Sequence, residues 1–422
     1  MLSAGLALIG MAAPARAAQV AASQPTQVSF WHFMSGGAGV NQTQIINAFN
    51  RTHPTIHVNA LLLQWGVPFY TKLTTSVAGN AAPDVVTMHL SRLPYFAAKG
   101  VLSTVSPTEL AAHGLTSSKF VAKAWAQTHY NGAQYAVPLD THPQILYYNK
   151  TLAKQVGLLS ANGLLSPITG AAQFLHTCQV FKQKTGKYCV ALDDADSAGM
   201  WRTWYTLYIQ QNGQVLAGNG AKVVIDPAKA QTALAFLSTL VAQGLAPKNT
   251  DYNTMIALFG SGKALFEING PWEIPTYAGK LSYDMALFPQ LYANADTWTD
   301  AHSLAIPTHN HMDAKTRDAA LTFITYYETH SLTWAQGGLI PAYLPVVDST
   351  AFKTYLPMAH VTLEGAHVVF DPTASYTGAA SPIETDATVP LLEGVNGRLS
   401  VQAAVQKMIA KVQQMAGANG GF

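Results

Sequence analysis

Along the first hundred residues, short apolar runs alternate with segments in which apolar residues recur every three or four positions. Residues 28–33 (VSFWHF) form one such run and predict a strand. The next segment places Ile45, Ile46 and Phe49 on one face, which predicts an amphipathic helix, and residues 56–63 (IHVNALLL) predict a second strand. The order strand, loop, helix, strand is typical of an α/β sheet.

The same alternation continues downstream. Residues 82–90 (APDVVTMHL) predict a third strand, and residues 95–102 (YFAAKGVL) predict a helix that ends near Gly100. Residues 222–244 predict a strand and then a helix that begins after Asp226, a favourable N-cap residue. The predicted fold class is therefore α/β, with helices on the faces of the sheet and ligands bound at the carboxyl ends of the strands.

One segment breaks this alternation. Residues 133–150 (AQYAVPLDTHPQILYYNK) hold two apolar runs around a centre containing Pro and His, which predicts an extended crossing between two lobes. Two domains are also expected because 422 residues exceed the size that one hydrophobic core usually serves. The predicted first lobe comprises residues 28–140 and 303–330, the second comprises residues 141–302 and 331–417, and residues 418–422 form a flexible tail.

The composition argues against several classes of partner. Apolar residues make up 49% of the chain, so intrinsic disorder is excluded. Charged residues make up only 11%, the formal net charge is +2 and the arginines are scattered. Neither nucleic acid nor an anionic membrane is therefore an expected partner. Fourteen histidines would make the chain much more positive in an acidic medium.

The N-terminal segment predicts an export signal. Residues 1–17 (MLSAGLALIGMAAPARA) are almost wholly apolar or small and end in the small-x-small pattern of a signal-peptidase site. No Lys or Arg precedes the apolar run, and a membrane anchor is the alternative, although the run is shorter than the ~20 residues that a bilayer requires. No cysteine follows the run, so lipid attachment is not expected. The mature protein is predicted to be soluble and periplasmic or extracellular.

The cysteines and the acidic residues give no metal motif. In an oxidising compartment Cys178 and Cys189 are more often bridged than free, and a pair of buried thiols is the alternative. Without histidines at ligand spacing, these two cysteines do not form a zinc site. Residues 194–199 (DADSAG) faintly resemble a calcium loop, but no glutamate closes it. Neither a metal nor a cofactor is expected.

Motifs of catalysis are scarce. The chain has no G-x-S-x-G elbow and no H-E-x-x-H motif, and residues 260–264 (GSGKA) lack the spacing and the hydroxyl of a phosphate loop. Asp193 and Asp194 are adjacent and would point apart on a strand. Glycoside hydrolysis needs two carboxylates that face each other across a cleft, and the sequence leaves such a pair open. A binding protein is predicted rather than an enzyme.

Residues 264–273 (ALFEINGPWE) place a tryptophan where a core residue is not expected. The apolar run ends in a turn at Gly270 and Pro271, and Trp272 follows directly. A core tryptophan normally sits inside a helix or strand, whereas one just past a Gly-Pro turn is free to face outward. We therefore expect Trp272 to face a ligand.

Other aromatic residues also follow predicted strands or lie in predicted loops, namely Phe33, Trp65, Trp201 and Tyr343. Packing in the core is the alternative for each of them, and it is the stronger interpretation for Trp204. A sugar ring has flat patches of C–H groups, and stacking that removes about 100 Å² of apolar surface contributes about 2.5 kcal/mol. A micromolar dissociation constant requires about 8 kcal/mol. Several aromatic side chains and a hydrogen-bonding rim must therefore converge between two lobes.

Longer motifs give the chain a family resemblance. Residues 262–272 (GKALFEINGPW) and 146–150 (LYYNK) are specific, and residues 71–86, 133–150 and 396–408 match in the same order. Over nearly the whole mature chain, these motifs resemble those of the bacterial extracellular solute-binding proteins of the maltose-binding type, the capture subunits of ATP-driven sugar importers. The resemblance implies a type II periplasmic binding protein fold, with mixed sheets flanked by helices and a ligand cleft between two lobes.

The resemblance also implies roles for single residues. Trp272 matches a tryptophan that stacks on sugar in maltose-binding relatives, and Arg92 falls where those relatives have an arginine beside the ligand. Ser91 takes the place of a binding carboxylate, His142 falls near another binding acid, and Glu384 lies roughly where a further aromatic stacks. These departures put maltodextrin itself in doubt. The full set of predicted ligand-binding residues is Trp272, Arg92, Ser91, His89, Trp65, Phe33, Asp140, His142, Trp201, Gly270, Tyr343 and Glu384.

The predicted function is capture of a mono- or oligosaccharide by a monomer whose lobes close about a hinge at Asp140 and His142 and deliver the sugar to a membrane permease. A branch of the same family that binds glycerol 3-phosphate or glycerophosphodiesters also begins FWH and is an alternative. Phosphate recognition favours converging arginines, and here only Arg92 and Arg202 lie in candidate loops. A secreted glycan hydrolase is the second alternative.

Overall fold

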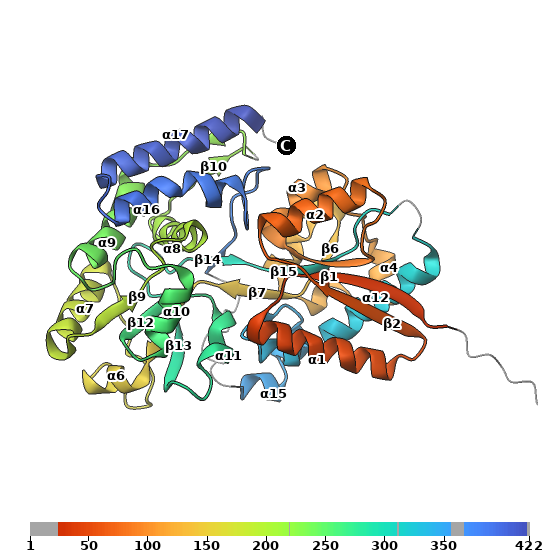
Figure 1. Ribbon diagram of the computed structural model, residues 1–422, viewed down its shortest axis with the longest axis horizontal. Helices are drawn as coiled ribbons and strands as arrows, with labels where there is room; N and C mark the ends of the chain where they lie inside the picture. Colours follow the sequence, from red (N-terminus) through yellow and green to blue (C-terminus); the bar gives the residue numbers. More distant parts are fainter. Residues whose placement is uncertain (1–23, 219, 310–311, 356–366, 420–422) are drawn as a thin grey trace, which may run out of the picture.

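The computed structural model describes residues 24–218, 220–309, 312–355 and 367–419. The predicted export signal lies outside these residues, as do the last three residues of the predicted tail. Figure 1 shows two groups of sheets and helices with extended strands running between them. We call the group that carries β1 and α1 the first lobe and the group that carries β12 and α9 the second lobe.

The first lobe is built on a five-stranded mixed sheet. β1 pairs in parallel with β2 and β3, and β15, which returns from far along the chain, runs antiparallel between β3 and β6. The strands, in sheet order, are β2 (Ile56–Leu62), β1 (Thr26–His32), β3 (Val85–His89), β15 (His302–Ala305) and β6 (Ala136–Pro138). The helices of this lobe are α1 (Gly36–Thr52), α2 (Val67–Ala78), α3 (Leu93–Ala98), α4 (Pro107–Ala112), α5 (Ala122–Gln127), α12 (Ala314–Thr329) and α13 (Ser331–Ala335). A short hairpin joins β4 (His129–Tyr130) to β5 (Ala133–Gln134).

The second lobe is built on a four-stranded mixed sheet. β8 lies antiparallel between β13 and β12, and β12 pairs in parallel with β9. The strands are β13 (Tyr283–Leu287), β8 (Ile145–Asn149), β12 (Ala264–Asn269) and β9 (Tyr188–Ala191), with a small hairpin of β10 (Leu216–Ala217) and β11 (Lys222–Val223). The helices are α6 (Lys150–Gln155), α7 (Ala171–Thr185), α8 (Ser197–Ile209), α9 (Pro227–Ala242), α10 (Tyr252–Gly260), α11 (Ile274–Tyr277), α16 (Val389–Val395) and α17 (Val401–Asn419).

A third sheet lies where the chain passes between the lobes. β7 (Asp140–Pro143) runs antiparallel to both β14 (Thr297–Asp300) and β16 (Ile340–Pro341), and β14 pairs in parallel with β17 (Val368–Val369). β7 continues directly into β6 of the first lobe and β8 of the second, and β14 continues directly into β15 of the first lobe (Figure 1). The extended crossing predicted at residues 133–150 is therefore confirmed. Two short helices, α14 (Leu344–Val347) and α15 (Thr350–Lys353), follow β16.

Two large hydrophobic cores correspond to the two lobes. One gathers buried residues of the first lobe between Val28 and Val346, and the other gathers residues of the second lobe between Leu146 and Ala416. The buried side chain of Trp334 packs in the first of these cores. We therefore adjust the proposed lobe boundaries, because the segment just after residue 331 packs with the first lobe rather than the second.

Local sequence signals place some of the helix boundaries. Asp226 accepts hydrogen bonds from the backbone of Ala228 and Lys229 and so caps α9, as predicted. α1 buries Ile45, Ile46 and other apolar residues against the sheet. α17 continues to Asn419, so the first residues of the predicted tail are helical. Among the described residues, none of the helices has the length and apolarity needed to cross a bilayer.

A buried carboxyl group in β12 makes the stability of the second lobe depend on pH. Burial, opposed by hydrogen bonds from Tyr277 and Asn269, raises the pKa of Glu267 from 4.5 to about 8. The folded protein thus holds a proton here that the unfolded chain has already released. The free energy of unfolding therefore falls as the pH rises from 4.5 through 8.

We expect the Glu267→Gln variant to lose this contribution to the pH dependence. Between pH 6 and pH 9, wild type should lose on the order of 2 kcal/mol more of its unfolding free energy than the variant, as urea titration would measure. The half-buried Glu393, changed to Gln, is the matched control and should follow wild type. Parallel curves for wild type and Glu267→Gln would contradict the prediction.

Candidate functional site

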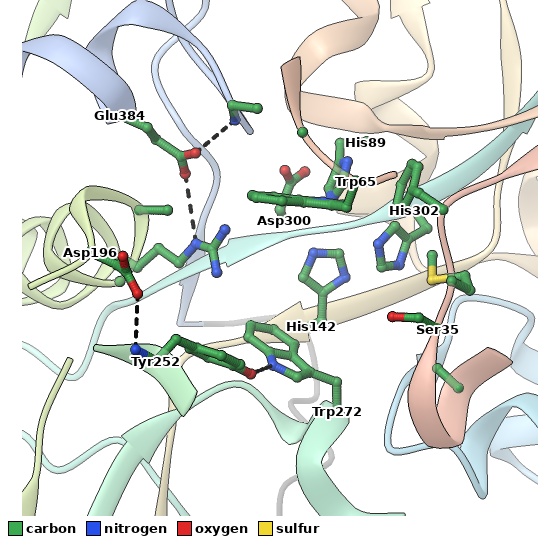
Figure 2. Close-up of a pocket in the computed structure, with 18 of the residues that line it drawn as sticks. Ser35, Trp65, His89, His142, Asp196, Tyr252, Trp272, Asp300, His302 and Glu384 are labelled. Atoms are coloured by element: carbon green, nitrogen blue, oxygen red, sulfur yellow. Dashed lines mark hydrogen bonds and ion pairs between the residues drawn. The ribbon is translucent and has the colours of Figure 1, made fainter. Parts of the chain in front are cut away.

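A cavity of about 720 Å³ lies between the two lobes. Its walls come from the loops after β1 and β2 and the end of β3 in the first lobe, and from α8, α10 and the turn after β12 in the second, while β7 and β14 cross it (Figure 2). The side chains that matter most below are Phe33, Trp65, His89, His142, Arg202, Tyr252, Trp272, Asp300, His302 and Glu384. A ligand in this cavity would contact both lobes.

The turn after β12 presents Trp272 to the cavity. Its indole is half-buried and packs against the cores of both lobes, and its Nε1 donates to the hydroxyl of Tyr252 at 2.6 Å. A methyl group at Gly270 would lie 1.8 Å from the indole, so only glycine leaves room for the ring there. The predicted placement of Trp272 at the gap between the lobes agrees with the structure, and Gly270 serves to position it.

Two further aromatic residues line the cavity from the first lobe. Trp65, on the loop after β2, is 41% exposed, which is unusual for a tryptophan. Phe33, just after β1, is buried and stacks face to face on the imidazole of His89 at a centroid distance of 4.9 Å. The cavity therefore has exposed indole surface on both sides.

A hydrogen-bonded network around Asp140 forms the floor of the cavity. Its carboxylate lies 2.9 Å from Nδ1 of His142 and 2.8 Å from Nδ1 of His302. It also accepts from Nε1 of Trp334 at 2.8 Å and from the backbone N–H of His302 at 2.9 Å. Burial alone would raise the pKa of Asp140, but the two histidines outweigh it and hold that pKa well below its usual range.

Burial favours the neutral form of two of the imidazoles on this floor, those of His142 and His89. Burial, followed by the neighbouring His302, lowers the pKa of His142 to about 4, against the opposing hydrogen bond from Asp140. Burial and the two neighbouring histidines likewise lower the pKa of His89 well below its usual value. Neutral rings can accept a hydrogen bond or bind a metal at one nitrogen.

Charged groups of the second lobe complete the rim. The guanidinium of Arg202 lies over the rings of Trp298 and Trp272, at 5.0 and 5.7 Å, and its Nε is 3.7 Å from Glu384. Burial raises the pKa of Glu384 to about 7, with Arg202 opposing it. Burial and nearby Asp371 similarly raise the pKa of Asp300 to about 7. This wall can both donate and accept hydrogen bonds at neutral pH.

Two of the predicted aromatic residues do not reach the cavity. Trp201 is fully buried in the second core, where it stacks on Tyr205 at 5.2 Å and donates from Nε1 to Asp371 at 2.7 Å. Tyr343 is buried in the first core and packs against Phe120 at 5.3 Å. The expectation that these rings face a ligand is corrected: both serve packing.

Three predicted polar residues lie behind the cavity wall rather than on it. The guanidinium of Arg92 is enclosed by aromatic rings, among them Tyr95 at 5.1 Å, and donates to the carbonyl of Thr377 at 2.9 Å. Ser91 donates from its hydroxyl and backbone N–H to Asp300 and so orients that carboxylate. Asp140 acts in the same way on His142. The expectation that Arg92, Ser91 and Asp140 contact the ligand directly is therefore corrected: they act indirectly, from behind the cavity wall.

The cavity also contains residues that the sequence did not single out as binding residues, namely Tyr252, Trp298, Asp300 and His302. His302 joins His142 only because the chain returns through β14 and β15. The one sequence signal for this part of the site is that Asp300 and His302 stand at the ends of two apolar runs, on either side of residue 301. Of the predicted set, the cavity gathers Phe33, Trp65, His89, His142, Trp272 and Glu384.

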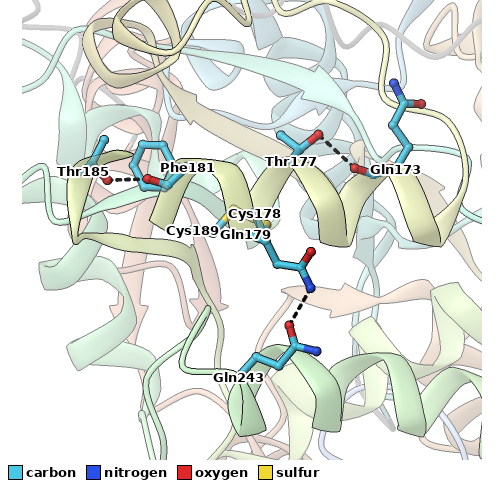
Figure 3. Close-up of a disulfide and its surroundings, with 8 residues drawn as sticks. All are labelled: Gln173, Thr177, Cys178, Gln179, Phe181, Thr185, Cys189 and Gln243. Atoms are coloured by element: carbon cyan, nitrogen blue, oxygen red, sulfur yellow. Dashed lines mark hydrogen bonds between the residues drawn. A yellow bond between two sulfur atoms is a disulfide. The ribbon is translucent and has the colours of Figure 1, made fainter. Parts of the chain in front are cut away.

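The disulfide lies away from the cavity. Cys178 on α7 and Cys189 on β9 form a disulfide that ties the helix to the sheet of the second lobe (Figure 3). Both residues are fully buried in the second core. The prediction of a bridge is confirmed, and its role is structural.

Comparison with known proteins identifies a family model and relatives that this chain resembles. The family model described as bacterial extracellular solute-binding protein matches residues 41–331. The maltodextrin-binding protein MdxE of Bacillus subtilis is 26% identical over 230 residues, which cover 51% of this chain and 49% of that protein. A maltooligosaccharide ABC transporter solute-binding lipoprotein of Streptococcus pneumoniae is 25% identical over 235 residues, or 52% of this chain and 50% of that protein. The chain thus spans about half the length of these curated relatives.

Solved structures share the fold over almost the whole chain. The GacH receptor of Streptomyces glaucescens, solved unliganded and with acarbose, has a TM-score of 0.79 at 20% identity, covering 93% of this chain and 99% of that chain. The sugar-binding protein MalE of Xanthomonas citri has a TM-score of 0.76 at 20% identity, covering 93% of this chain and 98% of that one. The predicted two-lobe α/β binding-protein fold is confirmed.

Proposed function

We propose, since the chain belongs to the family of bacterial extracellular solute-binding proteins, that it captures a mono- or oligosaccharide in the cavity between its lobes and delivers it to the permease of an ABC importer. The named relatives support this assignment, because they are described as binding maltodextrin or maltooligosaccharide. Export from the cell and function as a monomer are parts of the same proposal.

The single observation that carries the proposal is the pair of indoles on opposite walls of one cavity. Trp65 is 41% exposed in the first lobe, Trp272 is half-buried at the edge of the second, and both line a volume of about 720 Å³. Cavities of roughly 300–1,000 Å³ are typical of small-molecule sites. Stacking on both indoles would contribute up to about 5 kcal/mol, and hydrogen bonds must supply the rest of the ~8 kcal/mol of micromolar binding.

The polar rim suits hydroxyl groups. The lining includes the carboxylates of Asp300 and Glu384, the guanidinium of Arg202, the hydroxyl of Tyr252 and neutral imidazoles such as His142. Carboxylates and neutral imidazoles accept hydrogen bonds, and guanidinium and tyrosine groups donate them. A sugar hydroxyl does both, so each hydroxyl can find a partner on this rim.

Closure of the lobes explains how binding is coupled to delivery. The lining comes from both lobes, so a ligand makes all of its contacts only when the lobes are together, and binding shifts the equilibrium toward that state. β7 and β14 join the lobes and are the proposed hinge strands. A permease could then distinguish the loaded receptor by its shape.

The charge of the cavity argues against the phosphate-binding alternative. Five carboxyl groups line it, from Asp193, Asp196, Glu273, Asp300 and Glu384, and burial raises the pKa of Asp193 to about 8 and those of Asp300 and Glu384 to about 7, so these three are only partly ionised at neutral pH. Arg202 is the only lysine or arginine in the described lining, and it already lies beside Glu384. A phosphodiester would meet more negative than positive charge, so a neutral sugar fits better.

A thermal-shift screen followed by calorimetry tests the proposal. The panel contains monosaccharides, maltooligosaccharides, other oligosaccharides and glycerophosphodiesters. We expect at least one sugar to raise the melting temperature and to bind with one-to-one stoichiometry, and to be recovered chemically intact. Selective binding of a glycerophosphodiester would favour the phosphate branch, and sustained release of shorter sugars would identify a hydrolase.

A further inference from the structure

Three histidines from three separate segments meet on the floor of the cavity. His89 ends β3, His142 lies in β7 and His302 begins β15 (Figure 2). All three are buried, and one ring nitrogen of each lies within 4.8 Å of the others. The ring centroids of His142 and His302 are 4.3 Å apart, and those of His89 and His302 are 4.7 Å apart.

Each ring is held through its Nδ1 atom. The carboxylate of Asp140 lies 2.9 Å from Nδ1 of His142 and 2.8 Å from Nδ1 of His302. An ionised carboxylate only accepts, so both Nδ1 atoms carry a proton, and in the neutral form of each ring the lone pair is on Nε2. Nδ1 of His89 lies 2.8 Å from the hydroxyl of Tyr70, which can accept in the same way. This arrangement of outer partners is the one that orients metal-bound histidines in proteins.

The three Nε2 atoms are left without protein partners. Throughout the described parts of the chain, no hydrogen bond to any of them is found, and none of them is among the fully buried polar atoms that lack a partner, so they are open to the cavity. A lone pair on any of these Nε2 atoms has no protein donor and is free to bind a ligand from the cavity. A cation placed between them would satisfy all three at once.

We propose that His89, His142 and His302 bind one divalent transition-metal ion, with zinc as the best fit, through their Nε2 atoms. Imidazole suits zinc, copper and nickel, whereas calcium and magnesium require oxygen ligands. Zn–N bonds of 2.0–2.1 Å place tetrahedral ligands roughly 3.3 Å apart, so small rotations of the rings suffice to close the site. The fourth position faces the cavity, where a water molecule or an oxygen of a bound ligand would complete the tetrahedron.

This metal site stands independently of the proposed sugar, because the three ligands and their outer partners come from the protein alone. A metal ion here would place a positive charge among the carboxylates of the cavity. It would also lie a few ångströms from the indole of Trp272, because the ring centroids of Trp272 and His142 are 5.7 Å apart. A protein that binds no sugar could therefore still bind the metal, and a protein that binds no metal could still bind the sugar. The two proposals are tested separately.

The experiment measures zinc directly on the mature chain, prepared without a purification tag. The protein is stripped with chelator, incubated with zinc chloride, passed through a desalting column and analysed by mass spectrometry of metals. We expect about one zinc per chain, retained in the presence of excess calcium and magnesium. Cobalt(II) added in place of zinc should give the intense visible absorption of a tetrahedral site.

Variants locate the metal. His142→Ala and His89→Gln should each weaken zinc binding by at least tenfold, while His176→Gln, an exposed histidine on α7, should bind zinc as wild type does. Circular dichroism checks that each variant is folded, and His89→Gln keeps the test informative if His142→Ala is not. Wild type that retains less than a tenth of a zinc per chain, or folded variants that bind zinc like wild type, would overturn the proposal.

Discussion

Replacing Asp140 with asparagine or alanine is expected to lower the free energy of unfolding by about 3–5 kcal/mol. The carboxylate is fully buried in β7 and accepts from the rings of His142 and His302, from Trp334 and from the backbone of His302. Alanine would leave these buried donors without an acceptor, and each such loss costs about 1–3 kcal/mol. Denaturant titration of the variants against wild type measures the effect.

Asparagine should be nearly as harmful as alanine, although it has the same shape. One carboxylate oxygen accepts from His142 and the backbone of His302, and the other accepts from the His302 ring and Trp334. An amide nitrogen at either place would face an N–H donor. The exposed Asp348, 3.7 Å from Lys353, is the matched control, and its change to asparagine should cost under about 1 kcal/mol. An Asp140→Asn variant within 1 kcal/mol of wild type would refute this account of the network.

Replacing Trp272 with alanine is expected to weaken binding of the selected sugar by more than tenfold. Loss of a stacking surface of about 100 Å² removes about 2.5 kcal/mol, which is well over a factor of ten in the dissociation constant. Because the indole is only half-buried, the melting temperature should change far less than the affinity. Calorimetry gives the affinity, and thermal unfolding without ligand gives the stability.

Matched variants separate stacking from packing. Trp272→Phe keeps a flat ring but loses the hydrogen bond to Tyr252, and it should bind within a few-fold of wild type. Gly270→Ala should displace the indole and weaken binding although it removes no ligand contact. Trp125 is not among the residues that line the cavity, so Trp125→Ala should leave affinity unchanged. A large fall in melting temperature with unchanged affinity in Trp272→Ala would show that the indole is a core residue.

The fold could be predicted well because its signals are local. The run at residues 28–33 and the helix that contains Ile45 each carry their own periodicity, and Asp226 caps its helix through side-chain contacts to the next turn. The return of the chain to the first lobe has no comparable local signal in the sequence. The packing of Trp334 in the first core depends on contacts with distant segments, which periodicity does not encode.

The site could be predicted only where position along the chain determines exposure. Trp65 and Trp272 follow strands directly, and such turns open at the edge of a sheet. Trp201 lies on α8, a helix with apolar and aromatic residues on every face, so its neighbours decide which side is covered. The three-histidine cluster could not be predicted from the sequence because His89, His142 and His302 are far apart along the chain and have no motif spacing.

The central claim is that a carbohydrate binds between the lobes against the indole that follows β12. A crystal structure of the protein with the sugar chosen by the screen tests this claim most directly, through the distance from the sugar ring carbons to the indole plane of Trp272. The account predicts a sugar within the 720 Å³ cavity and ring carbons about 4 Å from that plane. A sugar bound elsewhere on the protein, or one in the cavity that leaves the indole untouched, would contradict it.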